Sequence, residues 1–483
     1  MCNHLFIRIF TLAILFCCIA KANAIEVASG CATPIQSPQQ HIFYVDPTKG
    51  SMNNDGSSLR PWKTLAEVVD GRNKMVGGRN SSAPIKPGDA IYLMSGDHGN
   101  VQIIGAVNEE FITVQASPGQ IPVLRSLRVD GATKWMFIGL KIQGAGDGST
   151  NSLPGQALID FGHNAQRGST SDIIFTDGSV STADNVSNWT DLDWVKKPFM
   201  AGLRSGATCV TISNNHLFNL RNAIGIDGDR TLVAENRIDN FGNDGIELVA
   251  SHVIVRNNMI TNGRHTTSEP LHPDGIQGWT KNGVTNKNIT IDGNTIINFG
   301  ESNSLQGITI FDGRWDGLTI SNNVVVTNVW HGVAIYGVEN ARIINNTVVA
   351  SNPIKFPTWI SVQNAKDGTP SRNVIVRNNI ATQLTYAEFG VTADHNIIAD
   401  RMGTNVSGKP TFVSKPGLYG DYNVIEPNIY ATFVTVDHSR HVYDLRLKPN
   451  SPAIGAGNSE LSPKFDIVGK RRTVPPDIGA YNH

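Results

Sequence analysis

Eight short segments of the chain share one pattern, an alternating apolar run with an asparagine at the same point. The first four are VTISNNHLFNL (210–220), LVAENRIDNF (232–241), VIVRNNMITN (253–262) and ITIDGNTIINF (289–299). The other four are LTISNNVVVTN (318–328), ARIINNTVVAS (341–351), VIVRNNIATQ (374–383) and VTADHNIIAD (391–400). The shared residues are Asn215, Asn236, Asn258, Asn294, Asn323, Asn346, Asn379 and Asn396. Alternation of period two indicates β-strands, and its recurrence indicates a repeat architecture.

A second set of strands lies between these segments. It reads NAIGID (222–227), DGIELV (244–249), DGIQGW (274–279), QGITIF (306–311), HGVAIY (331–336) and TWISVQ (358–363). Each repeat therefore holds at least two short strands joined by turns rich in Gly and Asn. This pattern predicts an all-β fold, a single right-handed parallel β-helix, in which like strands of successive coils pair about 4.8 Å apart. We expect the recurring asparagines to form an internal ladder with a structural role.

Composition narrows the class of protein. The chain has 483 residues, and 40 Lys and Arg side chains balance 41 Asp and Glu side chains. The near-neutral charge without a basic block argues against nucleic acid as a partner, because phosphate binding needs clustered cations. An apolar fraction of 40% is ample for a folded core. We expect a monomer.

The N-terminus is typical of a secretory signal peptide. An apolar run over residues 5–20 is followed by Ala22-Asn23-Ala24, an A-x-A cleavage site. We therefore expect a secreted or periplasmic protein with no membrane span. Of five cysteines only Cys31 and Cys209 would remain after cleavage, and the sequence leaves open whether they pair.

The two ends of the chain carry a family resemblance. Residues 43–96, with TLAEVVDG as a short capping helix, and residues 443–481, with SPAIGAGN and PPDIGAY, resemble the opening and closing segments of secreted bacterial β-helix proteins. Together with the repeats, they make the chain similar to the pectate-lyase-like β-helix superfamily. The predicted organisation is a signal peptide (1–24), an N-terminal segment with its cap (25–84), the β-helix (85–415) and a closing segment (416–483). The superfamily includes lyases, hydrolases, epimerases and adhesins, so the resemblance does not fix the reaction.

The second set of strands carries the candidate site. We expect its outward face to present carboxylates, amides, one histidine and a column of aromatic side chains, while Ile224, Ile246, Ile276, Ile308 and Val333 fill the interior. Such a surface, flanked by a loop at 263–273, suits a polysaccharide, most readily an acidic one, because aromatic rings stack on sugars and cations bind carboxylates. The substrate-binding candidates are Glu247, Gln277, Trp279, Phe311, Arg314, Trp315 and His265.

Two reactions compete for the catalytic candidates. β-Elimination next to a uronate needs a base, a group that neutralises the carboxylate and a proton donor. The sequence offers His272 or His265 as the base, Arg264 or Arg314 as the neutraliser, and Tyr336 or His331 as the donor. Asp244, Glu247 and Asp274 could hold Ca²⁺ through oxygen ligands.

Hydrolysis would instead use Asp244 and Asp274 as an acid and base pair on adjacent coils. We favour the lyase, because the loop at 263–273 brings cationic side chains beside Asp274. A uronate C5-epimerase and a non-catalytic carbohydrate-binding adhesin are further alternatives.

Overall fold

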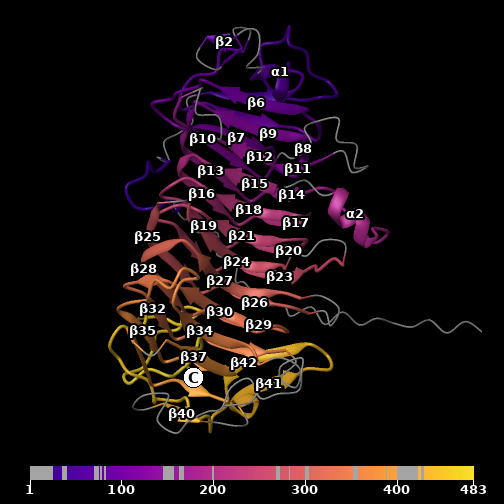
Figure 1. Ribbon diagram of the computed structural model, residues 1–483. Coiled ribbons are helices and arrows are strands. Elements are labelled where there is room, and N and C mark those ends of the chain that lie inside the picture. The colour runs from indigo at the N-terminus through magenta and orange to yellow at the C-terminus, as the bar shows by residue number, and fades with distance from the viewer. Residues whose placement is uncertain are drawn as a thin grey trace, which may run out of the picture.

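The computed structural model describes residues 25–34, 41–69, 75–76, 79–80, 83–144, 157–162, 168–197, 201–267, 272–281, 283–299, 304–351, 357–387, 389–399, 423–425 and 429–483. The predicted signal peptide, and part of the loop at 263–273, lie outside these residues. Strands of three parallel sheets follow one another around each coil, and the coils stack from the N-terminal end of the molecule to the C-terminal end (Figure 1). This is the predicted parallel β-helix.

The 14-stranded sheet contains, in order, β1 (Ile42–Val45), β4 (Ala90–Leu93), β7 (Ile112–Ala116), β10 (Thr133–Ile138), β13 (Ser171–Thr176), β16 (Thr208–Ser213), β19 (Leu232–Ala234), β22 (Ile254–Arg256), β25 (Thr285–Asp292), β28 (Arg314–Ser321), β32 (Arg342–Ile344), β35 (Val374–Arg377) and β38 (Val391–Asp394), with β31 (Val338–Glu339) paired beside β28. The 13-stranded sheet contains β5 (Gly96–Asp97), β8 (Pro122–Leu124), β11 (Lys141–Gln143), β14 (Ser179–Ser181), β17 (His216–Leu220), β20 (Arg237–Phe241), β23 (Met259–Gly263), β26 (Thr295–Ile297), β29 (Val324–Thr327), β33 (Thr347–Ala350), β36 (Ile380–Ala381), β39 (Ile397–Ile398) and β40 (Val424–Ile425). The 11-stranded sheet contains β6 (Asn100–Ile104), β9 (Ser126–Asp130), β12 (Ala157–Phe161), β15 (Ala201–Ser205), β18 (Asn222–Ile226), β21 (Asp244–Leu248), β24 (Asp274–Trp279), β27 (Gln306–Asp312), β30 (His331–Tyr336), β34 (Trp359–Gln363) and β37 (Gln383–Tyr386). Parallel pairing thus begins before residue 85, because β1 pairs with β4.

The interior of the coils is filled by aliphatic side chains stacked in register. In the 11-stranded sheet Ile224 pairs with Ile246, Ile246 with Ile276, Ile276 with Ile308, and Ile308 with Val333. All five side chains are fully buried, as the sequence predicted. Removing these surfaces from water supplies the main driving force for stacking one coil on the next.

The asparagine ladder runs along the corner between the 14-stranded and 13-stranded sheets. The backbone N–H and Nδ2 of each asparagine donate to Oδ1 of the next, from Asn215 to Asn396, with distances of 2.9–3.0 Å at each rung. Asn423 extends the ladder by one further rung that the repeat pattern did not reveal. The residue before many of these asparagines is itself an asparagine in the left-handed region, as at Asn322 and Asn345, which turns the chain at the corner.

Short helices stand outside this frame. Helix α1 (Leu65–Val68) buries Leu65 and Val68 and contacts β6 near the N-terminal end, which confirms the predicted cap. Helix α2 (Asp191–Lys196) projects to the right of the coils in Figure 1, between β14 and β15. Its Trp194 is buried, as expected of a residue that packs this insertion on the coils. Among the described residues, no helix has the length and hydropathy needed to cross a membrane.

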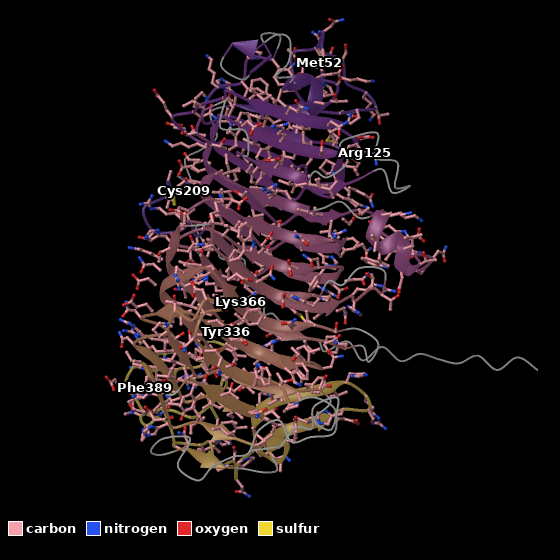
Figure 2. All side chains as sticks on the ribbon, viewed as in Figure 1. Met52, Arg125, Cys209, Tyr336, Lys366 and Phe389 are labelled. Carbon is pink, nitrogen blue, oxygen red and sulfur yellow. A yellow bond between two sulfur atoms is a disulfide. The ribbon has the colours of Figure 1, made fainter. Side chains whose placement is uncertain are left out.

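Residues 25–34 lie along the outside of the 14-stranded sheet. Ala28 packs against Leu232 and Ala234 of β19, and Glu26 forms an ion pair with Arg256 of β22. Cys31 forms a disulfide with Cys209, which lies on the left of the molecule in Figure 2. The sequence left this pairing open, and the structure shows that it forms.

The closing segment covers the C-terminal part of the 13-stranded sheet. It comprises a 3₁₀ helix, η2 (Ile429–Thr432), the antiparallel strands β41 (Phe433–Asp437) and β42 (Val442–Leu447), and the chain that follows them to residue 483. A further antiparallel pair, β2 (Met75–Val76) and β3 (Arg79–Asn80), lies near the opposite end. The closing segment buries the outward side chains of Val326, Val349 and Ile380 in a second apolar cluster.

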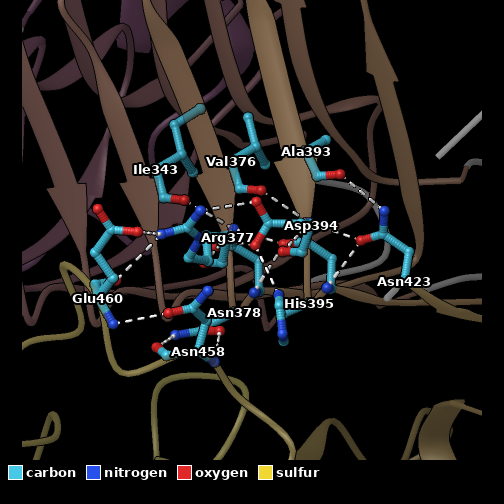
Figure 3. Close-up of polar contacts among 12 residues, drawn as sticks. Ile343, Val376, Arg377, Asn378, Ala393, Asp394, His395, Asn423, Asn458 and Glu460 are labelled. Atoms are coloured by element: carbon cyan, nitrogen blue, oxygen red, sulfur yellow. Dashed lines mark hydrogen bonds and ion pairs between the residues drawn. The ribbon is translucent and has the colours of Figure 1, made fainter. Parts of the chain in front are cut away.

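Ion pairs fix this segment to the last coils (Figure 3). Arg377 donates from Nε and Nη2 to the two carboxylate oxygens of Asp394, at 2.7 and 2.9 Å, and from Nη1 to Glu460 at 3.0 Å. Asn378 exchanges two hydrogen bonds of 2.8 Å with the backbone of Asn458. The segment therefore both shields the outer face of the sheet and is tied to the corner of the β-helix.

Candidate functional site

The candidate residues lie on the 11-stranded sheet, which runs down the middle of the view in Figure 1 from β18 to β34. Asp244 pairs with Asp274, and Glu247 pairs with Gln277, as the aligned repeats predicted. The predicted column of Trp279, Phe311 and Tyr336 is wrong at its first member. A register shift between Gly278 and Trp279 pairs Trp279 with Asp312 instead of with Phe311.

Asp244 and Asp274, which the sequence predicted on the outward face of the sheet, are both buried. Their residues are 2% and 0% exposed. The side chain of Asp274 is nevertheless on the face that carries Gln277 and His272, because both residues contact its carboxylate. In the strand of Asp244, Gly245 faces the interior instead, since a Cβ there would meet the core residue Ile260. Oδ1 of each aspartate is buried and has no hydrogen-bond partner among the described residues.

Burial raises the pKa of both carboxyl groups, but the charges around the two groups differ. Burial raises the pKa of Asp244 well above its ordinary value of 3.8, and the charges of Asp274 and Glu247 raise it further. Burial also raises the pKa of Asp274, but the hydrogen bond and charge of His272 oppose this shift. The arrangement therefore favours a protonated Asp244 beside an ionised Asp274.

His272 pairs with the buried Asp274. Its Nδ1–H donates to Oδ2 of Asp274 at 3.0 Å, while Gln277 donates to the same oxygen at 3.3 Å. The hydrogen bond to Asp274 raises the pKa of His272 above its ordinary 6.5. The His272 side chain is 56% exposed, so its other ring nitrogen is open to the surface. A histidine oriented by a buried carboxylate is suited to act as a general base.

His331 lies in an aromatic cluster two coils further on. Its ring packs edge to face against Phe311 and Trp359, with centroids 4.8 and 5.3 Å apart, and Phe311 also contacts Tyr336 at 4.6 Å. Trp359 Nε1 donates to His331 Nδ1 at 3.1 Å, so Nδ1 is unprotonated. Burial, together with the charge of His272, lowers the pKa of His331 to about 4, so this imidazole is neutral at ordinary pH.

Three members of the site were missed from the sequence: Trp330, Trp359 and Lys366. Trp330 stacks on Trp359 with centroids 6.0 Å apart, which widens the aromatic surface. Lys366 forms an ion pair of 2.7 Å with Asp312, and its charge lowers the pKa of His272 and opposes the rise in the pKa of Tyr336. Tyr336 and Lys366 lie close together in Figure 2. Trp359 could have been found from the sequence, because it belongs to the repeat segment TWISVQ. Lys366 could not, because it lies in a turn that the repeat pattern does not include.

Arg264 and His265, the two cationic candidates that precede His272 in the chain, have surroundings that differ from those of His272. Arg264 lies over the ring of Trp194 in α2, with its guanidinium carbon 4.9 Å from the ring centroid. His265 is exposed in the same turn. These contacts place Arg264 at the flank of the sheet, against the helix, so the structure offers Lys366 as a second cation nearer to Tyr336.

The predicted Ca²⁺ ligands do not converge. Glu247 accepts a hydrogen bond of 2.6 Å from Trp279 Nε1, and Asp244 accepts one of 2.6 Å from Asn243. Among the residues that the structure describes, no three carboxylate, imidazole or thiol groups come together as a metal site. In the part of the chain that the structure describes, the three predicted residues do not fit a calcium site.

Arg314 and Trp315 lie at the neighbouring corner, where the chain passes to the 14-stranded sheet. The predicted substrate contact of Trp315 is wrong for this conformation, because the residue is 1% exposed and its Nε1 donates to the backbone of Asp312 at 3.2 Å. Arg314 donates to Asp367 at 2.7 Å. Both residues line a pocket to which no strand of the 11-stranded sheet contributes a residue.

Comparison with known proteins supports the fold. A family model described as "Right handed beta helix region" matches residues 201–414. Together with the three parallel sheets, this match defines the chain as a right-handed parallel β-helix protein, the class to which the resemblance pointed. A search of curated proteins finds no match.

Solved structures that are similar include a pectate lyase, Pel9A (15% identity, TM-score 0.42, covering 92% of this chain and 97% of that one). XylC in complex with xylose is 11% identical, with a TM-score of 0.49, and covers 91% of this chain and 98% of that one. An alginate lyase from Paenibacillus is 14% identical, with a TM-score of 0.42, and covers 73% of this chain and 99% of that one. These similarities concern the fold.

Proposed function

We propose that the chain is an exported enzyme that cleaves a uronate-containing polysaccharide by β-elimination. The observation that carries the proposal is the half-exposed His272, whose Nδ1–H is held by the buried carboxylate of Asp274. Elimination needs a base that reaches the sugar, and His272 has the surface access that Asp274 lacks. The predicted signal peptide and the Cys31–Cys209 disulfide support export to an oxidising compartment.

The remaining roles follow from charge and burial. His272 removes the proton from C5 of the uronate, and Lys366 stabilises the negative charge that develops on the adjoining carboxylate. The electron pair left at C5 forms a C4–C5 double bond as the C4–O bond breaks. Burial raises the pKa of Tyr336, so its hydroxyl stays protonated and can donate its proton to the departing oxygen.

Hydrolysis is the second candidate, and one observation favours it. The raised pKa of Asp244 would let it act as the acid beside an ionised Asp274. Both carboxyl groups are buried, however, and a hydrolytic pair must contact the glycosidic oxygen and a water molecule. Their burial favours His272 as the group that meets the sugar, with Asp274 in a positioning role.

Activity on a panel of polysaccharides tests whether His272 is catalytic. New reducing ends would be measured on polygalacturonate, alginate, glucuronan and, as a neutral polymer, xylan. We expect cleavage of an acidic polymer, and His272→Ala should lower kcat by about 10²-fold or more, which is the usual contribution of a general base. His41→Ala is the matched control, because His41 also pairs with a buried aspartate, Asp89, but beside β1 and β4 on the first coils of the molecule. Equal activity of His272→Ala and the wild type would refute the assignment.

A further inference from the structure

Strand β30 holds His331 at a defined position on the 11-stranded sheet. His331 is the first residue of the strand, and it pairs with Trp359 of the next coil. Val333 pairs with Ile360, so β30 has one extra residue, Gly332, at this place. A Cβ at Gly332 would clash with side chains of the interior, so the backbone packs closely there. A bulge that is fixed in this way sets the direction of the side chain beside it.

The imidazole ring of His331 is held by two aromatic contacts and one hydrogen bond. Phe311 and Trp359 pack edge to face against it, with centroids 4.8 and 5.3 Å away. The indole Nε1–H of Trp359 donates to Nδ1 of His331 at 3.1 Å. An indole nitrogen is only a donor, so Nδ1 has to accept and carries no proton. The neutral ring therefore carries its proton on Nε2.

Nε2–H is the other polar group of this ring. It has no hydrogen-bond partner among the residues that the structure describes, and it is not buried, so it reaches solvent. Strands β24, β27 and β30 are neighbours in the sheet, which places His331 two coils, about 10 Å, from Asp274 at the backbone. The charge of His272 contributes to the low pKa of His331, so the two rings lie within electrostatic reach of each other. The sheet thus presents an N–H donor beside the proposed base.

We propose that Nε2–H of His331 donates a hydrogen bond to an acceptor oxygen of a uronate residue in the polymer. His331 is then a substrate-binding residue that acts as a neutral donor, and Trp359 is a positioning residue that keeps the proton on Nε2. The inference rests on the proposed function, since it places the polymer on the surface that carries His272. It replaces the proton-donor role expected for His331, because a neutral imidazole keeps its N–H proton and offers it only as a hydrogen bond.

The absence of charge separates the contribution of His331 from that of Lys366. Attraction between the ammonium group of Lys366 and a carboxylate weakens as salt is added, because ions screen exposed charges. A hydrogen bond from an uncharged N–H depends far less on salt. Lys366→Ala should therefore reduce the salt dependence of polymer binding, whereas His331→Ala should leave that dependence as it is in the wild type.

Polymer binding would be measured with His272→Ala as the parent protein, so that the proposed cleavage does not interfere. Migration through gels that contain polygalacturonate, alginate or glucuronan gives the dissociation constant. We expect one of these polymers to bind, and the addition of His331→Ala to raise its dissociation constant about tenfold, as for the loss of one hydrogen bond. His331→Gln places an amide N–H near the position of Nε2–H and should restore most of the affinity. His252→Asn is the control, because His252 is 46% exposed, precedes β22 of the 14-stranded sheet and has a left-handed backbone conformation that Asn accepts.

NMR of the ring nitrogens tests the position of the proton without any polymer. We expect His331 in the wild type to be uncharged at neutral pH, with Nδ1 unprotonated. Trp359→Phe keeps an aromatic ring but removes the donor to Nδ1, so both neutral forms of His331 should appear and the polymer should bind several-fold more weakly. An imidazolium at neutral pH, or a proton on Nδ1, in the wild type would overturn the proposal.

The binding results distinguish this inference from the proposed reaction. Binding that depends on His331 supports the inference even if the wild type releases no unsaturated product. The inference fails if no acidic polymer binds, if His331→Ala binds as tightly as its parent, or if His331→Gln binds as weakly as His331→Ala. Elimination by the wild type would stand in the last two cases, because it requires only His272 and its partners.

Discussion

Asp274 controls His272 by electrostatics as well as by position. A buried carboxylate that accepts a hydrogen bond from Nδ1–H stabilises the charged imidazolium and holds the ring with its other nitrogen toward the surface. This stabilisation makes the base stronger, but it also means that the base is lost to protonation at a higher pH. The pH dependence of the reaction therefore reports directly on this pair.

The first prediction concerns the acid limb of the pH profile. Because the pKa of His272 is raised above 6.5, kcat/KM should fall as pH decreases through a value above 6.5, where the base becomes protonated. In Asp274→Asn the stabilising charge is removed, so the pKa of His272 should drop and the limb should move to lower pH. NMR titration of the His272 ring gives the same pKa independently of activity. A limb that stays in place, or moves to higher pH, would contradict the proposed pairing.

The second prediction concerns Lys366. If its ammonium stabilises charge on the substrate carboxylate, Lys366→Ala should lower kcat/KM on an acidic polymer by about 10-fold or more, and Lys366→Arg should recover part of it. Lys63→Ala is the control, because Lys63 is exposed and lies just before helix α1, at the N-terminal end of the coils. Unchanged kinetics in Lys366→Ala would remove Lys366 from the mechanism.

At the scale of elements, the asparagine ladder joins one coil to the next through buried amides. Asn323 accepts two hydrogen bonds from Asn294, donates two to Asn346, and donates another to the carbonyl of Ile291. Loss of this side chain removes the acceptor of the backbone N–H and Nδ2 of Asn294 and the amide donor to the carbonyl of Ile291, all inside the fold. Such groups cost about 1–3 kcal/mol each.

The third prediction follows from this accounting. Asn323→Ala should lower the free energy of unfolding by about 2–4 kcal/mol, measured by urea denaturation, because more than one buried partner is left unsatisfied. Asn53→Ala, at an exposed position, should change the free energy by less than about 0.5 kcal/mol. Equal stability of the two variants would show that the ladder contributes nothing to the fold.

The sequence predicted those features that repeat. The Asn ladder, the buried isoleucines and the pairing of Asp244 with Asp274 follow from a motif that recurs on successive coils. The burial of both aspartates was not predicted, because it depends on the neighbouring side chains that cover them, such as His272 over Asp274 and Asn243 over Asp244. The register shift after Gly278 and the place of Lys366 also escaped prediction, since each occurs once, in a turn whose conformation no periodicity encodes.

On the scale of the whole molecule, the closing segment protects a sheet surface that would otherwise be apolar and exposed. Arg377 is the main electrostatic link, since it joins Asp394 of the last coils to Glu460 of the segment. Its guanidinium is largely buried with Asp394, whereas the Glu460 side chain is 73% exposed. The two ion pairs should therefore differ greatly in their contributions to the free energy of unfolding.

The fourth prediction uses this difference. Arg377→Ala leaves Asp394 as a largely buried charge whose main partner is lost, which costs about 3 kcal/mol for a pair of this kind. Glu460→Ala removes only an exposed partner and should cost less than about 1 kcal/mol. Thermal unfolding and limited proteolysis of the closing segment would compare the two variants. A larger effect of Glu460→Ala would contradict the assigned burial.

The central claim is that this solenoid cleaves its polymer by elimination from a uronate, with His272 as the base. The most direct measurement compares the ultraviolet absorbance of an unsaturated uronate with the appearance of new reducing ends during digestion of the best polymer. We predict that absorbance rises in proportion to the reducing ends and that both disappear in His272→Ala. Reducing ends without any rise in absorbance would contradict elimination and would move the reaction to hydrolysis by Asp244 and Asp274.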